Sequence, residues 1–195
     1  MFDLAWLVYS HSDFQMNHSE AATVLLRPHR ESDKQAFAAV ARNEEFYRLL
    51  GAAAPTELSR AQEAELWFQK KTDPTHSWAV EVDLKCVGSV FLHSIEPDNR
   101  RARFAIELFD PAYWGRGIGT SATRQVVRFA FEILRLHRLD LRVLTVNTRA
   151  IRCYEWCGFV KEGVQRDTLF NDGEWFSDLW MSMLESEYVP SGPTR

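Results

Sequence analysis

The sequence predicts an α/β (α+β) protein built on one mixed, mainly antiparallel sheet. Apolar runs with a period of two alternate along the chain with stretches of helical spacing, and short turns join several neighbouring runs. Because hairpins rather than crossover helices connect many of these strands, a doubly wound parallel fold is excluded. With 195 residues, 46% of them hydrophobic, the chain is long and apolar enough for one domain with a substantial core.

The first half of the sequence opens with a strand and a helix. The strand over 24–28 ends at a proline, which cannot donate to a sheet ladder. The helix after Ser32 has apolar residues at helical spacing, and Phe37, Val40 and Ala41 fall on one face. This face is expected to pack against the sheet.

A second helix is predicted to begin at Ser59, whose hydroxyl can cap it, and the side chain of Gln62, three residues later, can bond back to the backbone of Ser59. The helix turns Leu66 and Trp67 inward and stops at Pro74. Alternating apolar runs then predict a hairpin followed by another strand. These three strands cover 78–82, 86–92 and 102–109.

A long amphipathic helix over 120–136 is expected in the second half. Its buried stripe consists of Ala122, Val126, Phe129, Ala130, Ile133 and Leu134. A strand over 139–146 follows, and Asn147 can cap a short helix that ends at Gly158, a residue suited to the left-handed conformation. Two last strands enclose an Asp-Gly turn. These strands are 164–170 and 175–184.

The domain is expected to span 23–188, between an N-terminal extension over 1–22 and a C-terminal tail over 189–195. The extension does not read as a secretory signal, because Asp3 precedes its apolar run and no basic region is present. No apolar run approaches the ~20 residues of a membrane helix. The net charge of −4 argues against general nucleic-acid binding. Neither a membrane nor a nucleic acid is an expected partner.

The cysteines Cys86, Cys153 and Cys157 are expected to be free core thiols in the reducing cytoplasm. An odd number of cysteines does not make a disulfide framework, and no CxxC pair or histidine cluster indicates zinc. No histidine lies near Cys153 in the sequence to activate it as a nucleophile.

The segment 113–120 contains a glycine-rich turn between a strand and the long helix. Small residues let backbone N–H groups approach a ligand, and the partial positive charge of a helix N-terminus favours phosphate. Residues 111–131 contain Arg116, Arg124 and Arg128 but no carboxylate, so this window carries +3 while the rest of the chain carries −7. The pattern predicts an anion site in an acidic protein.

Two other anion-binding loops are excluded by spacing. A P-loop requires GxxxxGK[ST], and a dinucleotide fold requires GxGxxG with an acidic residue ~20 positions on. Gly115, Gly117 and Gly119 instead form a GxGxG run. A turn without any ligand is the alternative that the glycines alone leave open.

The run Trp114-Gly-Arg-Gly-Ile-Gly119 resembles the phosphate loop of the GNAT superfamily of acyl-CoA N-acyltransferases, although Trp replaces the usual Arg or Gln at its first position. The block 147–159 is similar to that family's Asn-x-x-Ala/Ser-x-x-x-Tyr-x-x-x-Gly-Phe pattern, and 170–183 resembles its last hairpin. The resemblance covers 23–188. It is greatest for the branch with ribosomal-protein N-terminal, spermidine and some antibiotic acetyltransferases.

The resemblance implies a GNAT fold, with six to seven strands, helices on both faces and a splayed V between the two central strands. Acetyl-CoA would bind there as co-substrate, with its pyrophosphate at 115–120, and no metal is required because the thioester is already activated. The cofactor-binding residues that it implies are Leu108, Phe109, Trp114, Gly115, Arg116, Gly117, Ile118, Gly119, Thr120, Asn147, Arg149, Ala150 and Tyr154.

The implied reaction is direct attack of an amine on the thioester. Tyr154 occupies the family's position for the acid that protonates the thiolate, and its phenol pKa of ~10 is close to that of an alkyl thiol. The family's Leu-Glu-Val context reads Leu-Arg142-Val here, so that carboxylate is absent. We expect Glu107 to be the base, with burial raising its pKa. Asp140 and a relay through water are the alternatives for the base. Tyr154 could instead only pack its helix against the sheet, and Glu107 could instead lie on a solvated face of its strand.

The acceptor pocket is expected between the early helices and the last hairpin. Carboxylates at Glu44, Glu45, Glu57, Glu63 and Glu65 would attract a cationic amine, or form ordinary solvated faces. Aromatic rings at Phe46, Tyr47, Trp67, Trp175 and Trp180 would line the pocket or belong to the core. A peptide N-terminus, a polyamine and an aminoglycoside-like amine stay open as acceptors, and a homodimer is left open. The rival function is a GNAT-like domain that binds acyl-CoA as a sensor or assembly module.

Overall fold

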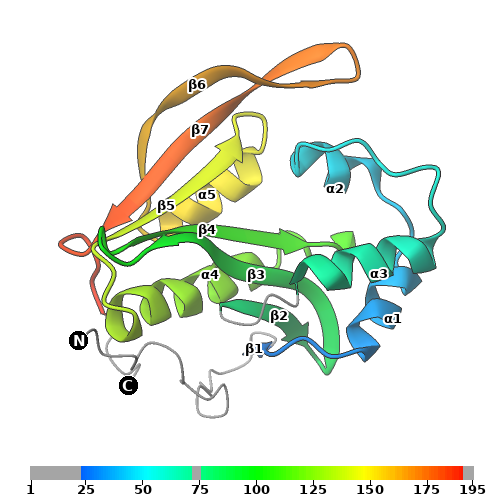
Figure 1. Ribbon diagram of the computed structural model, residues 1–195, viewed down its shortest axis with the longest axis horizontal. Helices are drawn as coiled ribbons and strands as arrows, with labels where there is room; N and C mark the ends of the chain where they lie inside the picture. The colour runs from blue at the N-terminus through cyan, green and yellow to red at the C-terminus, as the bar shows by residue number, and fades with distance from the viewer. Residues whose placement is uncertain (1–22, 72–75, 191–195) are drawn as a thin grey trace.

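The computed structural model of the protein describes residues 23–71 and 76–190, which form one sheet flanked by helices (Figure 1). The sheet has seven strands in the order β1-β2-β3-β4-β5-β7-β6. The strands are β1 (Val24–Arg27), β2 (Ser77–Val82), β3 (Lys85–Glu96), β4 (Arg101–Leu108), β5 (Arg138–Leu144), β6 (Val160–Asn171) and β7 (Glu174–Leu184). The helices are α1 (Ser32–Ala39), α2 (Glu44–Leu49), α3 (Arg60–Lys71), α4 (Ile118–Arg128) and α5 (Thr148–Trp156).

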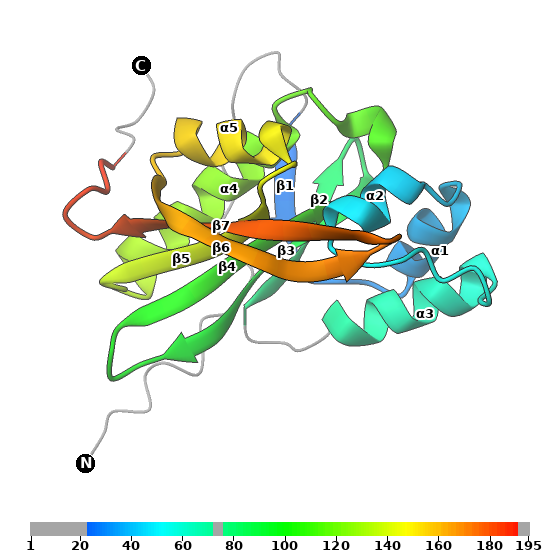
Figure 2. The ribbon, with the colours of Figure 1, turned by 90° about the horizontal axis from the view of Figure 1, so that it is seen from above.

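Helices cover both faces of the sheet (Figure 2). Successive residues of a strand point to opposite faces, so apolar side chains on both faces pack against helices. Val80 packs into the larger core, which contains Ala122 and Val126 of α4 and Ile151 of α5. Ile133 of the predicted stripe is 36% exposed and lies outside this core. Its neighbour Ala79 packs into a second, aromatic core beneath α1 and α3. In that core Phe37 stacks on Trp67 with ring centroids 5.1 Å apart. The predicted mixed sheet with helices on both faces is confirmed.

The central strands β4 and β5 separate along most of their length. Their parallel bridges join only Arg101–Arg103 to Arg138–Asp140. Beyond this point β5 continues its ladder with β7, while β4 continues its ladder with β3. The predicted splayed V is therefore present, and it leaves the edge of β4 over 104–108 open toward β5.

Several local predictions are confirmed by hydrogen bonds. Ser59 and Gln62 exchange bonds, with Ser59 N to Gln62 Oε1 at 2.9 Å and Gln62 N to Ser59 Oγ at 3.3 Å. Asn147 caps α5 by accepting from Ala150 N at 3.1 Å. Gly158 has a φ of +98°, as expected of a residue after a helix end. The Asp-Gly turn between β6 and β7 has positive φ at both residues.

Other expectations about the early helices were wrong. Helix α1 ends at Ala39, so Val40 and Ala41 lie beyond it. Leu66 is 45% exposed, because the buried side of α3 is formed by Glu63, Ala64 and Trp67. Helix α2 was not predicted, since six residues are too few for a clear apolar period. The expected stop at Pro74 lies outside the described residues.

Element boundaries also differ in the second half. Helix α4 begins two residues before the expected Thr120, because the turn closes already at Gly117. Its last turn, Phe129–Ile133, is π-helical. Strand β5 ends at Leu144, and β6 begins at Val160 with register shifts that its bulges introduce. Within the described ranges, no helix is long and apolar enough to cross a membrane.

Candidate active site

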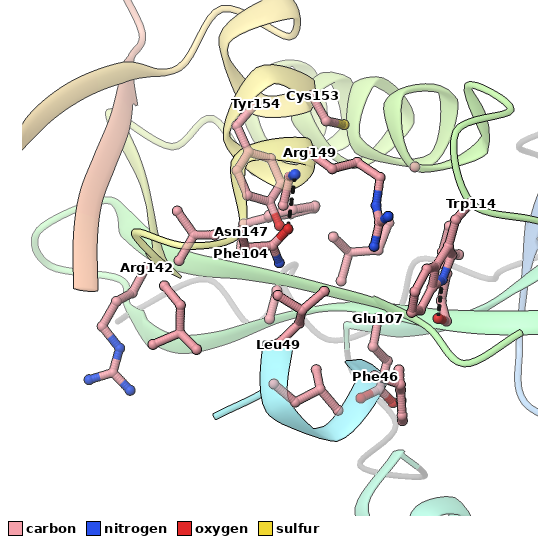
Figure 3. A pocket seen from close by; sticks show the side chains of 18 of the residues that line it. Phe46, Leu49, Phe104, Glu107, Trp114, Arg142, Asn147, Arg149, Cys153 and Tyr154 are labelled. Atoms are coloured by element: carbon pink, nitrogen blue, oxygen red, sulfur yellow. Dashed lines mark hydrogen bonds between the residues drawn. The ribbon is translucent and has the colours of Figure 1, made fainter. Parts of the chain in front are cut away.

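A cavity of about 440 Å³ lies where β4 and β5 separate (Figure 3). Its walls come from β4, the glycine turn, the start of α4, β5, α5, α2 and the β6–β7 hairpin. The cavity therefore has two ends, which we name by their walls. The turn end is bounded by the glycine turn, α4 and α5, and the hairpin end is bounded by α2 and the β6–β7 hairpin.

The glycine turn and the start of α4 line the turn end. Asp110 starts the turn by accepting from Ala112 N at 3.1 Å. Gly115 and Gly117 have φ of +72° and +78°, and a Cβ at either residue would meet no atom within 4 Å. These glycines are thus required by backbone conformation, not by crowding. Gly117 is the N-cap residue of α4 and has no side chain, so the first N–H groups of the helix stay available to an anion.

Trp114 ties this turn to the end of β4. Its Nε1 donates to the carbonyl oxygen of Leu108 at 2.8 Å. The guanidinium of Arg149 lies 4.2 Å from the centre of the indole ring. The tryptophan at the unusual first position of the glycine motif therefore holds both the strand end and a cation beside the cavity.

The structure brings most of the predicted cofactor residues together. The predicted residues that line the cavity are Leu108, Trp114, Gly115, Gly117, Ile118, Gly119, Thr120, Asn147, Arg149, Ala150 and Tyr154. The side chain of Phe109 lies on the other side of the sheet, where its ring is 5.0 Å from that of Phe37. Strand alternation explains this placement, because Leu108 and Phe109 must face opposite ways. Arg116 also lies off the lining, with its guanidinium over Tyr113.

Tyr154 projects from α5 into the middle of the cavity. It is 8% exposed, and its ring packs against those of Phe104 and Phe159 at 6.1 and 6.0 Å. Burial raises the pKa of its phenol, and the nearby thiols of Cys153 and Cys157 raise it further. The hydroxyl therefore keeps its proton over the neutral pH range.

Glu107 lines the cavity from β4, and its partners come from α3, which is distant in the sequence. Its Oε1 accepts from Trp67 Nε1 at 2.6 Å and pairs with Lys71 Nζ at 3.0 Å. Lys71 also lies over the ring of Phe91, 4.3 Å from its centre. The end of α3 thus fixes the Glu107 carboxylate in an ion pair, which local sequence could not indicate.

A second carboxylate in the cavity was missed by sequence reasoning. Asp178 is buried on β7, accepts from Thr168 Oγ1 at 2.7 Å and pairs with Arg142 Nε at 3.4 Å. All three residues line the cavity. They come from β7, β6 and β5, which only the order of the sheet makes adjacent. The one feature of the sequence that could have indicated this site is the position of Asp178 within a mainly apolar strand.

The expected acidic wall is not formed. Glu63 is buried between Arg42 and Arg60 and accepts from the hydroxyl of Tyr47 at 2.6 Å. Glu65 pairs with Lys34. The other expected carboxylates are Glu44, Glu45 and Glu57, and none of the five lines the cavity. Helix α2 instead directs apolar side chains inward.

Among the five candidate aromatic residues, Phe46 alone lines the cavity. Trp67 belongs to the aromatic core, and the hydroxyl of Tyr47 is held by Glu63. Trp175 is 61% exposed near the tip of the hairpin, and Trp180 stacks with Arg103. The hydrophobic period of a strand or helix did not indicate which of these rings lines the cavity, which belongs to the core and which is exposed.

The three cysteines do not share one environment. Cys86 is buried, as expected, and burial raises the pKa of its thiol to about 12. Cys153 is only half-buried and lines the cavity, with its Sγ 3.3 Å from Thr120 Oγ1. A hydrogen bond with Cys157 lowers the pKa of the Cys153 thiol. Cys153 and Cys157 pack against the larger core, as expected, but both are only half-buried.

Comparison with known proteins identifies the family. The sequence model described as the acetyltransferase (GNAT) domain matches residues 23–160, which is most of the chain. The protein therefore belongs to the GNAT acetyltransferase family. This confirms the resemblance that the glycine turn and the Asn147 block indicated.

Relatives come from the expected branch. The chain is 33% identical over 103 residues to spermidine N(1)-acetyltransferase of Vibrio cholerae, covering 53% of this chain and 59% of that protein. It is 32% identical over 117 residues to the Escherichia coli K12 enzyme of the same name, covering 60% and 62%. These alignments thus span less than two thirds of either relative.

Solved structures agree over a longer stretch. The crystal structure of Vibrio cholerae spermidine N-acetyltransferase in complex with CoA and spermine has a TM-score of 0.70 and 26% identity, and the match covers 84% of this chain and 96% of that one. A Bacillus anthracis GNAT-family acetyltransferase has a TM-score of 0.73 at 18% identity, which supports the fold alone.

Proposed function

We propose that this protein is an N-acetyltransferase that moves the acetyl group of acetyl-CoA to a primary amine by direct attack. The observation that carries the proposal is one shared cavity: the uncapped start of α4 and the proton-bearing hydroxyl of Tyr154 both open onto it. The first feature suits a pyrophosphate and the second suits a leaving thiolate. Family membership supports the same reaction.

Acetyl-CoA fits the turn end as the acyl donor. Backbone N–H groups at 115–120 would hold its pyrophosphate, with the hydroxyl of Thr120 and the guanidinium of Arg149 nearby. The open edge of β4 near Leu108 would pair with the pantetheine arm. The oxygen of Asn147 caps α5, so its amide nitrogen is the part left to bind that arm. The solved relative with bound CoA supports this choice of co-substrate.

The transfer needs two proton movements and no metal. The amine nitrogen attacks the thioester carbonyl, the new C–N bond forms, and the C–S bond breaks. Glu107 accepts the proton that the amine must lose, directly or through water, and Tyr154 supplies a proton to the thiolate. The Lys71 and Trp67 contacts position the Glu107 carboxylate at the cavity wall.

The acceptor is proposed only as a class. A peptide N-terminus, a polyamine and an aminoglycoside-like amine are the three candidates, and the names of the relatives favour a polyamine. We place the reaction in the cytoplasm, which suits the free thiols at Cys86, Cys153 and Cys157. A homodimer stays open.

The test is thiol release with a panel of amines, combined with calorimetric titration of acetyl-CoA. Tyr154→Phe should lower kcat by about 100-fold or more, because general acid catalysis contributes on that scale. The variant should still bind acetyl-CoA. Tyr188→Phe is the matched control, since that hydroxyl bonds Glu132 at 2.8 Å, outside the cavity.

Two outcomes would contradict the proposal. Binding of acetyl-CoA with no turnover on any amine would favour the acyl-CoA sensor, which the arginine at position 142 supports. Absence of acetyl-CoA binding would exclude both functions.

A further inference from the structure

The hairpin end of the cavity is closed by two segments that lie far apart in the sequence. Gly51, just after α2, has a φ of +75°, and a Cβ there would approach Leu169 Cδ2 of β6 to 3.3 Å. The early helix and the late hairpin therefore meet at the cavity wall. An acceptor at this end is enclosed by their side chains.

These side chains are apolar. Phe46 and Leu49 of α2, and Leu50 directly after it, line the cavity together with Leu169 of β6. Phe46 is buried, whereas the charged residues Glu44, Glu45 and Arg48 of the same helix are exposed. Helix α2 thus turns its apolar side toward the cavity, while Glu44 and Arg48 face water and Glu45 pairs with the cavity-lining Arg149 at 3.7 Å.

The carboxylates that reach the cavity already have cationic partners. Among the residues that the structure describes, Glu107 and Asp178 are the acidic side chains of the lining. Glu107 pairs with Lys71 at 3.0 Å, and Asp178 pairs with Arg142 at 3.4 Å. Arg142 and Arg149 also line the cavity, so its charged side chains balance. This wall offers little to a ligand with several positive charges.

We infer that the acceptor is a primary monoamine carried on an apolar alkyl or aryl group. This inference rests on the proposed acetyl transfer and assigns it a different class of acceptor from the polyamine that the names of the relatives favour. The apolar group would be buried against α2 and Leu169, and the amine would face Glu107. A polyamine must place further ammonium groups in the same cavity. Each ammonium group that finds no carboxylate there loses its bound water and gains no ion pair, which weakens binding.

The first experiment compares acceptors on the unmodified protein. We expect kcat/KM for 2-phenylethylamine and n-hexylamine to exceed that for spermidine and kanamycin by at least about tenfold, a difference of about 1.4 kcal/mol in transition-state binding. Equal or better turnover of spermidine or kanamycin would overturn the inference and leave the acetyltransferase proposal intact. Acetyl-CoA binding without turnover of any amine would overturn the acetyltransferase proposal, and the inference with it.

The second experiment adds an unpaired carboxylate to the apolar wall. Leu49→Glu should raise the kcat/KM of spermidine relative to that of 2-phenylethylamine by about tenfold or more. Leu66→Glu is the matched control, because Leu66 is exposed on α3 and lies off the cavity lining. An unchanged ratio in a folded Leu49→Glu variant would contradict the inference. If that variant does not fold, Leu169→Glu makes the same test from the opposite wall.

Discussion

The two ends of the cavity are built in different ways. The turn end is assembled from one continuous stretch, 108–154, and presents mainly backbone groups and helix starts. The hairpin end is assembled from residues near 46–51, from Glu107 and from 168–178, and it presents side chains. A backbone site needs glycines and caps at fixed spacing, whereas a side-chain site depends on which strands become neighbours. The turn end therefore contains the family's glycine motif, and we propose that the hairpin end selects the acceptor.

The largest expected effect concerns Glu107. Glu107→Gln should lower kcat by about 100-fold at pH 7, because a general base contributes on this scale, and by much less at high pH, where free amine is abundant. The pH dependence of kcat measures this. Glu96→Gln is the control, since Glu96 lies at the far end of β3 and pairs with Arg101. A loss that is the same at every pH would remove Glu107 as the base.

The next prediction tests the turn end. Gly117→Glu should weaken acetyl-CoA binding by about 50-fold, or about 2.3 kcal/mol, because a carboxylate would replace an open approach to the helix start. Calorimetric titration measures the affinity. Gly173→Glu is the matched control, because Gly173 also has a positive φ, +83°, and a Cβ there also meets nothing within 4 Å, but the residue lies in the β6–β7 turn, off the lining. Unchanged affinity in Gly117→Glu would move the phosphate site elsewhere.

The free energy of unfolding should depend on pH through His29, which lies in contact with Trp67. His29 lies beside Trp67, with ring centroids 5.7 Å apart, and burial lowers its pKa from 6.5 to about 4. The unfolded chain therefore binds the proton more readily, and stability falls as the pH decreases from 6.5 toward 4. The expected loss from pH 7 to pH 5 is about 2 kcal/mol in urea unfolding. A His29→Gln variant that loses the same amount would assign the pH dependence to other groups.

The smallest expected effect is protection of Cys153. Its thiol lines the turn end and has a lowered pKa, so iodoacetamide should modify it at pH 7 faster than the buried Cys86. Acetyl-CoA at about ten times its Kd should slow the modification about tenfold. Peptide mass analysis measures the rate at each cysteine. Protection that is absent while acetyl-CoA is bound would place the cofactor away from α5.

Local sequence predicted what local geometry decides. The cap at Asn147, the left-handed Gly158 and the turn at 113–120 depend on neighbours within a few residues, and all three are present. The Glu107–Lys71 pair and the Asp178–Arg142 pair join strands or helices that are distant in the chain. No period or spacing contains that information.

Helix α2 shows the same limit from another direction. Six residues with three apolar positions fit many local conformations, so the local pattern does not indicate that Phe46 is buried in the aromatic core. The acidic composition of residues 43–65 predicted a wall of carboxylates, but composition does not indicate which way a side chain points. Ion pairs with Lys34, Arg42 and Arg60 turned two of the expected carboxylates away from the cavity.

The contact between Gly51 and Leu169 has a consequence for synthesis on the ribosome. The chain emerges from its N-terminus, so the residues of the turn end are complete once Tyr154 has been added. The hairpin end requires Leu169 and Asp178, which are added later. A growing chain thus contains every residue that we assign to the acyl donor before it contains the full wall for an acceptor. The proposed acceptor wall is complete only once Asp178 has been added.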